Sequence, residues 1–338
     1  MGKWTLVIAV FVGLCLGAEG APLRISLPPL LGAVPVALAD SWGVFSELGV
    51  EVTLVPLASQ RDRMAAFQAR QLDGLVTDLT SALMLAAMLP GEVVFLSTAY
   101  YPVDQTRPHL ALITQAYSGI EDLSQLSAQA AESHLKLALP RQSDLEFALD
   151  YLLLSHGLTP PTRAYIGQDN LLVNATWVLM GMVEAGVFPQ PYVDYLLHYQ
   201  YEGKPELVVL SWFPQVPSPP SVIVFHRPVV EGRAAEVAGF LQALELTVQR
   251  INSAERGELL DIGWDLAVEL FFPGLLGQEL EPEFQARLEE AIAAVGIPTF
   301  PPPGPVSQDI FQQVLSWAAG KGYLVGEVSY QEVMASRP

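Results

Sequence analysis

A cluster of small polar residues stands between two apolar runs, at a point where a strand is predicted to lead into a helix: Thr77, Asp78, Thr80 and Ser81. The run 72–76 before them is typical of a short strand, and the run 82–89 after them is long enough for a buried helix. The first turn of a helix leaves backbone N–H groups without internal partners and carries the positive end of the dipole. We therefore expect this junction to hold a polar or anionic group of a ligand. The alternative is that Thr80 or Ser81 only caps the helix.

An imperfect second copy of this pattern occurs about a hundred residues later. A helical apolar run is followed by a strand-like segment, 183–188, and by the turn Pro189-Gln190-Pro191, which leads into a helix from Tyr192. Two copies of one strand-to-helix element indicate two similar α/β lobes. Ligands of open α/β sheets lie beyond the carboxyl ends of the strands, so Gln190 becomes a ligand-binding candidate.

Two further helix starts carry polar side chains. Ser59, with Asp62 three residues later, fits a capping box, and Gln60 and Arg61 lie in the first turn of the same helix. An arginine there opposes the helix dipole, so an anionic ligand would explain Arg61; a solvated side chain is the alternative.

The second of these helix starts is the turn Arg141-Gln142-Ser143. Ser143 with Glu146 fits another capping box, at the start of a helix with an apolar face. Capping alone remains the alternative role for Ser143.

Three aromatic residues are candidates for stacking on a flat ligand. Tyr100 and Tyr101 leave a predicted strand, and Trp212 ends another, beside a proline-rich stretch. Tyrosine combines a ring with a hydroxyl group that can bind a polar atom. Packing in the core or on the surface is the alternative for each.

The first twenty residues indicate a secretory signal. Lys3 precedes an apolar run from Leu6 to Leu16, and Ala18-Glu19-Gly20 is typical of a cleavage site. The run is much shorter than the roughly twenty residues of a membrane-spanning helix. We therefore predict a cleavable signal peptide over residues 1–20.

The cysteine count limits the chemistry of the mature chain. Cys15 is the single cysteine and lies inside the signal, where Leu14 precedes it instead of the small residue of a lipoprotein signal. A lipid anchor is therefore not expected. A mature chain without thiols excludes disulfides, cysteine-bound metals and thiol nucleophiles.

The charge and the missing motifs exclude other functions. A net charge of -19 over 338 residues disfavours nucleic acid and anionic membranes as partners. The chain has no phosphate-binding glycine loop, no HExxH or GxSxG motif and no histidines at metal-ligand spacing. We predict no catalytic residues, no metal and no cofactor.

Several segments between residues 22 and 192 resemble the solute-binding proteins of ABC importers, in the NMT1/THI5-like branch for nitrate, sulfonate, taurine and thiamine precursors. The segments are Leu23-Arg24-Ile25-Ser26-Leu27, then 35–39 leading to 43–52, then Gln71-Leu72-Asp73-Gly74, and finally 183–187 with Pro191-Tyr192. Their order is typical of the family, while each segment alone is weak and none reports the ligand.

The resemblance implies an α/β fold of two lobes, the type II periplasmic-binding-protein fold, each lobe a mixed sheet flanked by helices, with a helical C-terminal region. Lobe 1 would comprise 21–104 and 214–338, and lobe 2 would comprise 105–213. The hinge crossings would lie near 99–108 and 212–221. In the periplasm or another extracytoplasmic space, a monomer would close over a small molecule and dock on an ABC permease coupled to its ATPase.

The resemblance also implies ligand contacts from the loop 29–34 and from the turn that carries Arg141 and Ser143. Family members often have Trp-Glu-Pro-Tyr where this chain has Pro189-Gln190-Pro191-Tyr192. Glutamine cannot balance a cationic group, so this departure weakens the case for an aminopyrimidine and favours a neutral or anionic ligand. A sulfonate, a carboxylate or a heteroaromatic vitamin precursor remains open.

Two other classes of function share this fold. An enzyme of pyrimidine-precursor synthesis would need a cysteine-rich motif that this chain lacks, and an enzyme of menaquinone synthesis does not suit a secretory signal. A ligand-sensing domain is the third alternative.

Overall fold

The structure is a computed structural model of the 338-residue chain. It describes residues 21–57, 59–103, 109–132, 135–198, 206–213, 216–255, 259, 266, 269–271, 282–294 and 298–334. The predicted signal peptide with Cys15, and part of each predicted hinge crossing, lie outside the described residues. Within these ranges, none of the helices combines the length and the apolar character that crossing a membrane requires.

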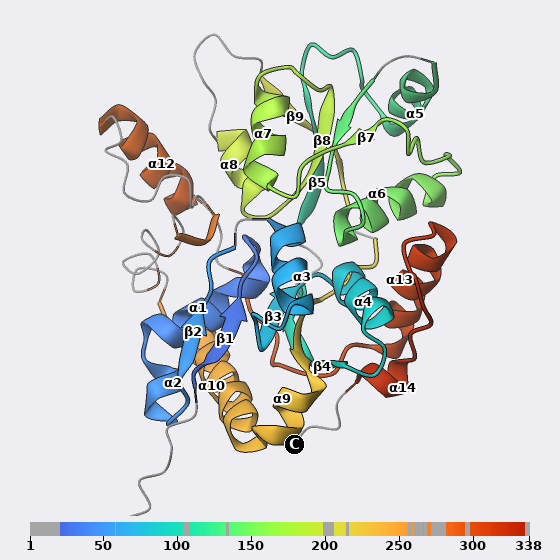
Figure 1. Ribbon diagram of the computed structural model, residues 1–338. Helices are drawn as coiled ribbons and strands as arrows, with labels where there is room; N and C mark the ends of the chain where they lie inside the picture. The colour runs from blue at the N-terminus through green and yellow to red at the C-terminus, as the bar shows by residue number, and fades with distance from the viewer. Residues whose placement is uncertain are drawn as a thin grey trace, which may run out of the picture.

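Two five-stranded mixed sheets form the centres of two lobes, one above the other in Figure 1. The first sheet has the order β2-β1-β3-β10-β4. Its strands are β1 (Leu23–Ser26), β2 (Val52–Leu54), β3 (Gly74–Thr77), β4 (Val93–Tyr100) and β10 (Ser221–His226). β1 runs parallel to β2 and β3, whereas β10 is antiparallel to β3 and β4.

The second sheet repeats this arrangement with the order β7-β6-β8-β5-β9. Its strands are β5 (Leu110–Gln115), β6 (Leu137–Ala138), β7 (Tyr165–Ile166), β8 (Ala185–Pro189) and β9 (Leu207–Trp212). β6 is parallel to β7 and β8, and β5 is antiparallel to β8 and β9. β3 and β8 are the middle strands of their sheets, which confirms that the two strand-to-helix patterns are equivalent elements of two similar lobes.

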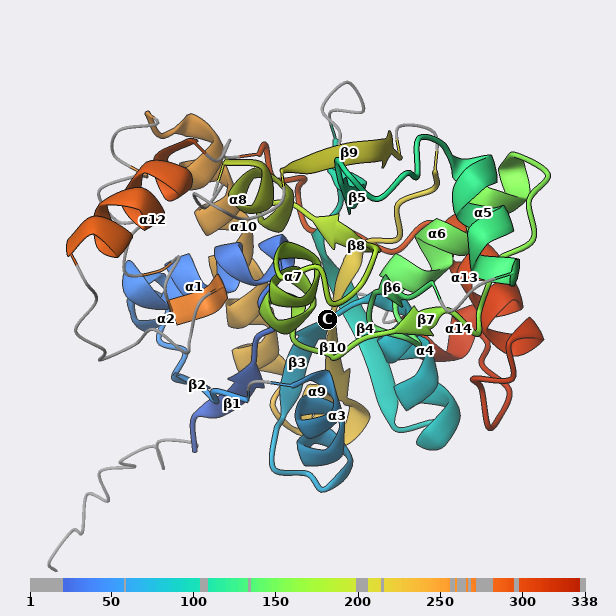
Figure 2. The ribbon, with the colours of Figure 1, turned by 90° about the horizontal axis from the view of Figure 1, so that it is seen from above.

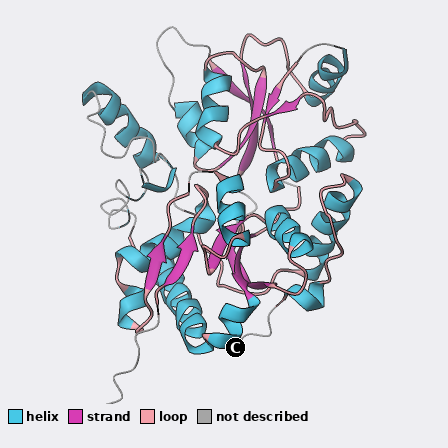
Figure 3. Ribbon diagram, viewed as in Figure 1, coloured by secondary structure: helices cyan, strands magenta, loops and turns pink. Residues whose placement is uncertain are grey.

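Helices cover both faces of the first sheet (Figure 3). On one face the apolar core includes residues of α1, α2 and α10, and on the other it includes residues of α3, α4, α13 and α14. The bounds are η1 (Leu31–Ala33), α1 (Val34–Ser41), α2 (Val44–Glu47), α3 (Gln60–Gln68), α4 (Leu79–Met88), α9 (Arg227–Gly232), α10 (Ala234–Ser253), α13 (Gln308–Gly320) and α14 (Tyr330–Val333).

The second sheet is likewise buried on both faces. One cluster includes residues of α5 and α6, and the other includes residues of α7 and α8. Their bounds are α5 (Leu123–Glu132), α6 (Asp144–Ser155), α7 (Leu171–Leu179) and α8 (Tyr192–His198).

A close approach between two strands explains the glycine at position 74, in the segment Gln71-Leu72-Asp73-Gly74. A Cβ atom on Gly74 would lie 2.5 Å from the ring of Phe225 on the neighbouring strand β10, so only glycine fits there. Asp73 beside it accepts hydrogen bonds from the backbone N–H of Arg24, at 2.8 Å, and from its side chain. This pair ties the start of β3 to β1.

The C-terminal region is helical and visits both lobes (Figures 1 and 2). α10 packs against α1 of the first lobe, and α13 packs against α4 of the same lobe. Between them, α12 (Pro282–Ala294) packs against α8 of the second lobe. The resemblance places all of 214–338 in lobe 1; within this range, α12 has its contacts with the second lobe.

Two crossings connect the two sheets, because β4 leads to β5 and β9 returns to β10. His109 lies at the end of the first crossing, and its Nε2 is 2.6 Å from the Oγ of Ser218 in the second. A hydrogen bond therefore joins the described parts of the two crossings.

A buried ion cluster links the segment after α13 to α6 of the second lobe. The Nζ of Lys321 lies 2.9 Å from an oxygen of Glu146 and 2.8 Å from an oxygen of Asp150. Both carboxylates are almost fully buried. Burial alone would lower the pKa of Lys321, but its hydrogen bonds to Asp150 and Glu146 outweigh this and raise the pKa. Lys321 is therefore charged and balances the two acids.

We predict that Lys321→Met lowers the free energy of unfolding by about 2–4 kcal/mol, because it leaves two buried carboxylates without their cation. Urea unfolding followed by circular dichroism measures this change. The matched control is Arg70→Met, which removes an exposed ion pair with Glu92 and should cost less than about 1 kcal/mol. Equal losses in the two variants would contradict the prediction.

Candidate functional site

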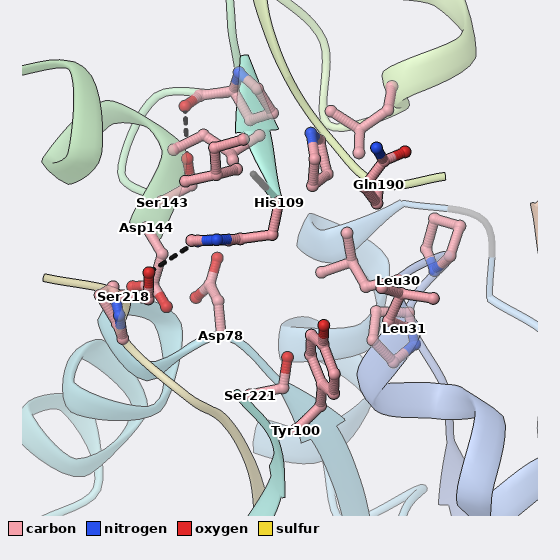
Figure 4. Close-up of a pocket in the computed structure, with 18 of the residues that line it drawn as sticks. Leu30, Leu31, Asp78, Tyr100, His109, Ser143, Asp144, Gln190, Ser218 and Ser221 are labelled. Atoms are coloured by element: carbon pink, nitrogen blue, oxygen red, sulfur yellow. Dashed lines mark hydrogen bonds between the residues drawn. The ribbon is translucent and has the colours of Figure 1, made fainter. Parts of the chain in front are cut away.

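A pocket of about 900 Å³, its open mouth included, lies between the two lobes (Figure 4). Both lobes and both crossings contribute to its lining. The lining residues are Pro28, Pro29, Leu30, Leu31, Gln60, Arg63, Asp78, Tyr100, Pro102, His109, Leu110, Pro140, Ser143, Asp144, Leu145, Asp169, Leu171, Pro189, Gln190, Ser218, Pro219 and Ser221.

The N-terminus of α4 points toward this pocket and is capped by Asp78. One oxygen of Asp78 accepts a hydrogen bond from the backbone N–H of Ser81, at 2.7 Å. The alternative prediction that Thr80 or Ser81 caps this helix is therefore wrong. A carboxylate suits the cap because it complements the helix dipole.

A second carboxylate reaches the same helix end from the opposite lobe. Asp144, the first residue of α6, accepts from the backbone N–H of Leu79 at 3.0 Å and from that of Thr80 at 2.9 Å. It also accepts from the hydroxyl group of Thr80 at 2.6 Å. Two helix N–H groups that would otherwise lack partners are thus satisfied across the interface between the lobes.

The two acids affect each other's protonation. Burial raises the pKa of Asp144 to about 8, and the negative charge of Asp78 adds to this effect. Burial also raises the pKa of Asp78, although its hydrogen bonds with Ser81 oppose the shift. Figure 4 shows the two side chains together at one end of the pocket. Two like charges in one desolvated place favour retention of a proton by the pair near neutral pH.

The N-terminus of α3 shows the same arrangement. Within lobe 1, the side chain of Ser59 accepts from the backbone N–H of Asp62 at 3.0 Å, which confirms the predicted cap. Asp169, from the loop before α7 in the second lobe, accepts from the backbone N–H of Arg61 at 3.3 Å. Carboxylates of lobe 2 therefore meet two helix N-termini of lobe 1.

Arg63 is the cation of the pocket lining, and it is almost fully buried. It donates to the backbone carbonyl of Leu57 at 3.0 Å, whereas its buried Nε has no partner. Burial lowers its pKa to about 10, and the nearby charges of Asp78 and Asp169 oppose the shift. The guanidinium group is charged at neutral pH and faces these two acids.

The other titratable groups of the lining are neutral at pH 7. Burial lowers the pKa of His109 to about 4 and raises that of Tyr100 to about 12. The ring of Tyr100 is tilted against Phe300 at a centroid distance of 5.4 Å. Both side chains can therefore offer hydrogen bonds without adding charge to the pocket.

Apolar side chains form the opposite end of the pocket. Leu30 and Leu31, from the loop that precedes α1, lie across the pocket from the acids in Figure 4. The hydroxyl group of Tyr192 in the second lobe donates to the carbonyl of Pro29 at 3.1 Å and holds this loop in place. The predicted loop 29–34 thus contributes Pro29, Leu30 and Leu31 to the lining.

The structure brings five of the predicted site residues to the pocket: Gln60, Asp78, Tyr100, Ser143 and Gln190. Ser143 caps α6 by accepting from the backbone N–H of Glu146, at 3.4 Å. The side-chain amide of Gln190 donates to Asp194 at 2.9 Å. Gln60 donates to the hydroxyl group of Ser81.

The other predicted site residues do not line the pocket. Thr77, Thr80 and Ser81 are buried at the start of α4, where Thr80 donates to Asp144 and Ser81 accepts from Gln60. Arg61, Tyr101, Arg141 and Gln142 are exposed, whereas Ser59 and Trp212 are partly buried. Arg141 donates to the hydroxyl group of Tyr323, at 3.3 Å.

Six polar lining residues were not predicted from the sequence: Arg63, His109, Asp144, Asp169, Ser218 and Ser221. Arg63 lies two positions after Arg61 and therefore on another side of α3. Asp144 follows the predicted cap Ser143 and looks like an ordinary acid in a first helical turn. Helical periodicity separates the direction of Arg63 from that of Arg61 and could have indicated Arg63 as a candidate. No local pattern indicates Asp144, because its partners belong to α4 of the other lobe.

Comparisons with known proteins support the fold. Neither a protein-family model nor a curated protein matches the sequence. Among solved structures, the nitrate-binding protein NrtA from Synechocystis PCC 6803 aligns with a TM-score of 0.66 and 14% identity, over 93% of this chain and 86% of that one. The aliphatic sulphonate binding protein SsuA from Escherichia coli aligns with 0.63 and 16%, over 94% and 92%.

A third neighbour, the alkanesulfonate-binding SsuA from Xanthomonas axonopodis pv. citri bound to MOPS, aligns with a TM-score of 0.63 and 14% identity, over 94% of this chain and 100% of that one. The chain has the type II periplasmic-binding-protein fold. Its two mixed sheets, with helices on both faces and a helical C-terminal region, match the fold class expected from the sequence.

We predict that the free energy of unfolding falls as pH rises from 7 to 9, and that Asp144→Asn reduces this fall. The folded-state pKa of Asp144, about 8, lies above its unfolded value, so the folded protein holds more protons. The stabilisation is complete below the unfolded pKa and is lost as pH rises through about 8. The slope for one proton is at most about 1.4 kcal/mol per pH unit. His109, with its lowered pKa, contributes only below this range.

Urea unfolding at half-unit pH steps measures the slope. The control is Asp309→Asn, which removes an exposed carboxylate from the first turn of α13 and should leave the slope unchanged. A slope in Asp144→Asn as steep as in the unmodified chain would contradict the assignment of the raised pKa to Asp144.

Proposed function

We propose that this protein is an extracytoplasmic solute-binding receptor of an ABC importer, whose two lobes close over a small organic molecule. The observation that carries the proposal is the pocket between two topologically equivalent lobes, lined from both of them and from both crossings. Its lining suits a small molecule, since ligand pockets combine mostly apolar walls with a few polar groups. The two connections between the lobes allow hinge closure around such a ligand.

The fold neighbours support this class of function. NrtA is described as a periplasmic nitrate-binding protein and SsuA as a periplasmic aliphatic sulphonate binding protein. A further neighbour is described as the ligand binding component of an ABC-type import system from Staphylococcus aureus, and it aligns with a TM-score of 0.63 at 12% identity. On this proposal the partners are a membrane permease and its ATPase, and the chain acts as a monomer in the periplasm after cleavage of its signal.

The NMT1/THI5-like branch is part of this proposal. Its support is the order of the sequence segments quoted above, together with the two-lobed fold. Within the ligand classes left open by the sequence, a sulfonate, a carboxylate or a heteroaromatic vitamin precursor, the three carboxylates of the lining favour the last.

A binding role is favoured over an enzymatic one. The named sulfonate and nitrate neighbours are binding proteins. The paired acids Asp78 and Asp144 are engaged as helix caps, which is a structural use of their oxygens.

We expect ligand-free protein, prepared by unfolding, dialysis and refolding, to show a thermal shift with at least one member of a panel of sulfonates, carboxylates, pyrimidines and flavins. A ligand at a hundred times its Kd stabilises by about 2.7 kcal/mol, which corresponds to roughly 4 °C for a chain of this size. A broad panel without any shift would count against a receptor of small molecules.

A further inference from the structure

We propose that the cleft is specific for an organic cation, whose ammonium or amidinium group lies against Asp78 and Asp144 while its apolar body lies against Leu30 and Leu31. The proposal rests on the receptor function proposed above and names the chemical class of its ligand. It also replaces the expectation, drawn from Gln190 alone, that the ligand is neutral or anionic.

The helix N-termini that face the cleft already hold carboxylates of the protein. An anion would find its best site at such a terminus, where free N–H groups and the dipole favour negative charge. At α4 the backbone N–H groups of Leu79 and Thr80 donate to Asp144. At α3 the backbone N–H of Arg61 donates to Asp169. A ligand anion would have to displace these carboxylates, which are delivered by the closing lobe itself.

The charge of the lining also opposes an anion. Among the described residues that line the pocket, three are acids, Asp78, Asp144 and Asp169, and one is a permanent cation, Arg63. Three negative charges and one positive charge leave -2, or -1 when the acid pair keeps one proton. His109 and Tyr100 add no charge at neutral pH. A cation would offset this negative charge, whereas an anion would add like charge in a desolvated site.

The acid pair has acceptor sites left for a ligand. A carboxylate offers about four lone-pair sites. Asp144 uses three of them, on Leu79 and on the N–H and hydroxyl groups of Thr80. Asp78 uses one for the backbone N–H of Ser81 at 2.7 Å and one for Gln60 at a long 3.5 Å, and it also accepts from the side chain of Ser81 and the backbone of Asp144. The fourth site of Asp144, and the site of Asp78 that Gln60 occupies only at 3.5 Å, can receive the N–H groups of an ammonium or a planar amidinium.

The rest of the pocket fits the body of such a ligand. Leucine and proline side chains dominate the lining away from the acids, and they come from both lobes: Pro29, Leu30, Leu31, Leu110, Leu145 and Leu171. Removing an aliphatic or flat aromatic group from water against these side chains stabilises the complex by roughly 25 cal/mol per Å². Charge at one end and apolar surface at the other orient the ligand (Figure 4).

The first test is a thermal-shift screen of ligand-free protein against small metabolites, with equal numbers of organic cations, neutral molecules and anions. Matched series such as benzamidine, benzamide and benzoate hold the body constant while the charge changes. We expect the shifts among the cations. Shifts confined to anions or neutral molecules would overturn the cation proposal and leave the receptor function standing. A complete absence of shifts would overturn the receptor function itself.

The second test uses the strongest cationic binder from the screen. Asp78→Asn and Asp144→Asn should each weaken its Kd roughly ten- to hundredfold, because a charge-assisted hydrogen bond contributes about 1.5–3 kcal/mol. The control Asp309→Asn removes the same charge from an exposed helix start and should leave the Kd unchanged. Unchanged affinity in both pocket variants, with folding verified by circular dichroism, would overturn the assignment.

The third test needs no variant. A ligand with a permanent positive charge stabilises the ionised acid pair, so its binding should release a fraction of a proton near pH 7.5 and its affinity should rise from pH 6 to pH 8. Calorimetry in two buffers of different ionisation enthalpy measures this release. Arg63 keeps its charge across this range, and His109 and Tyr100 stay neutral. Binding without proton release, or with proton uptake, would contradict contact with the acid pair.

Discussion

The N-terminus of α4 must find hydrogen-bond acceptors in a place that is closed to water, and much of the arrangement between the lobes follows from this requirement. Asp78 satisfies one N–H group from within the first lobe. Asp144 satisfies two more from the second lobe. Because a buried N–H group without a partner costs about as much as a lost hydrogen bond, these contacts hold the two lobes together at one end of the pocket.

This contact makes the geometry of the cleft depend on the position of α6. Its first residue, Asp144, faces the pocket, while Glu146 and Asp150 on its other side are bound by Lys321 from the C-terminal segment. The helix is thus fixed to the first lobe at two places. One helix therefore joins the ion cluster around Lys321 to the acid pair of the pocket.

The fold depends on the apolar core, whereas the chemistry of the pocket depends on a few polar residues of its lining. Structures that share 14–16% identity with this chain have the same two-lobed fold, which is set by apolar side chains on both faces of two sheets. The lining depends on single polar residues at the ends of strands and helices, such as Asp144 and Asp169. Such residues can change without disturbing the core, so likeness of fold leaves the chemistry of the ligand open.

The two lobes could be predicted from the sequence alone, because apolar periodicity and helix caps depend on residues that are close together in the chain. The doubled strand-to-helix pattern around Asp78 and Gln190, and the caps Ser59 and Ser143, could all be read in this way. Only the tertiary structure decided that Arg63 lines the pocket in place of Arg61, and that α12 lies against the second lobe. It alone paired Asp144 with α4, since these groups are 64 or more residues apart in the chain and meet only when the two lobes come together.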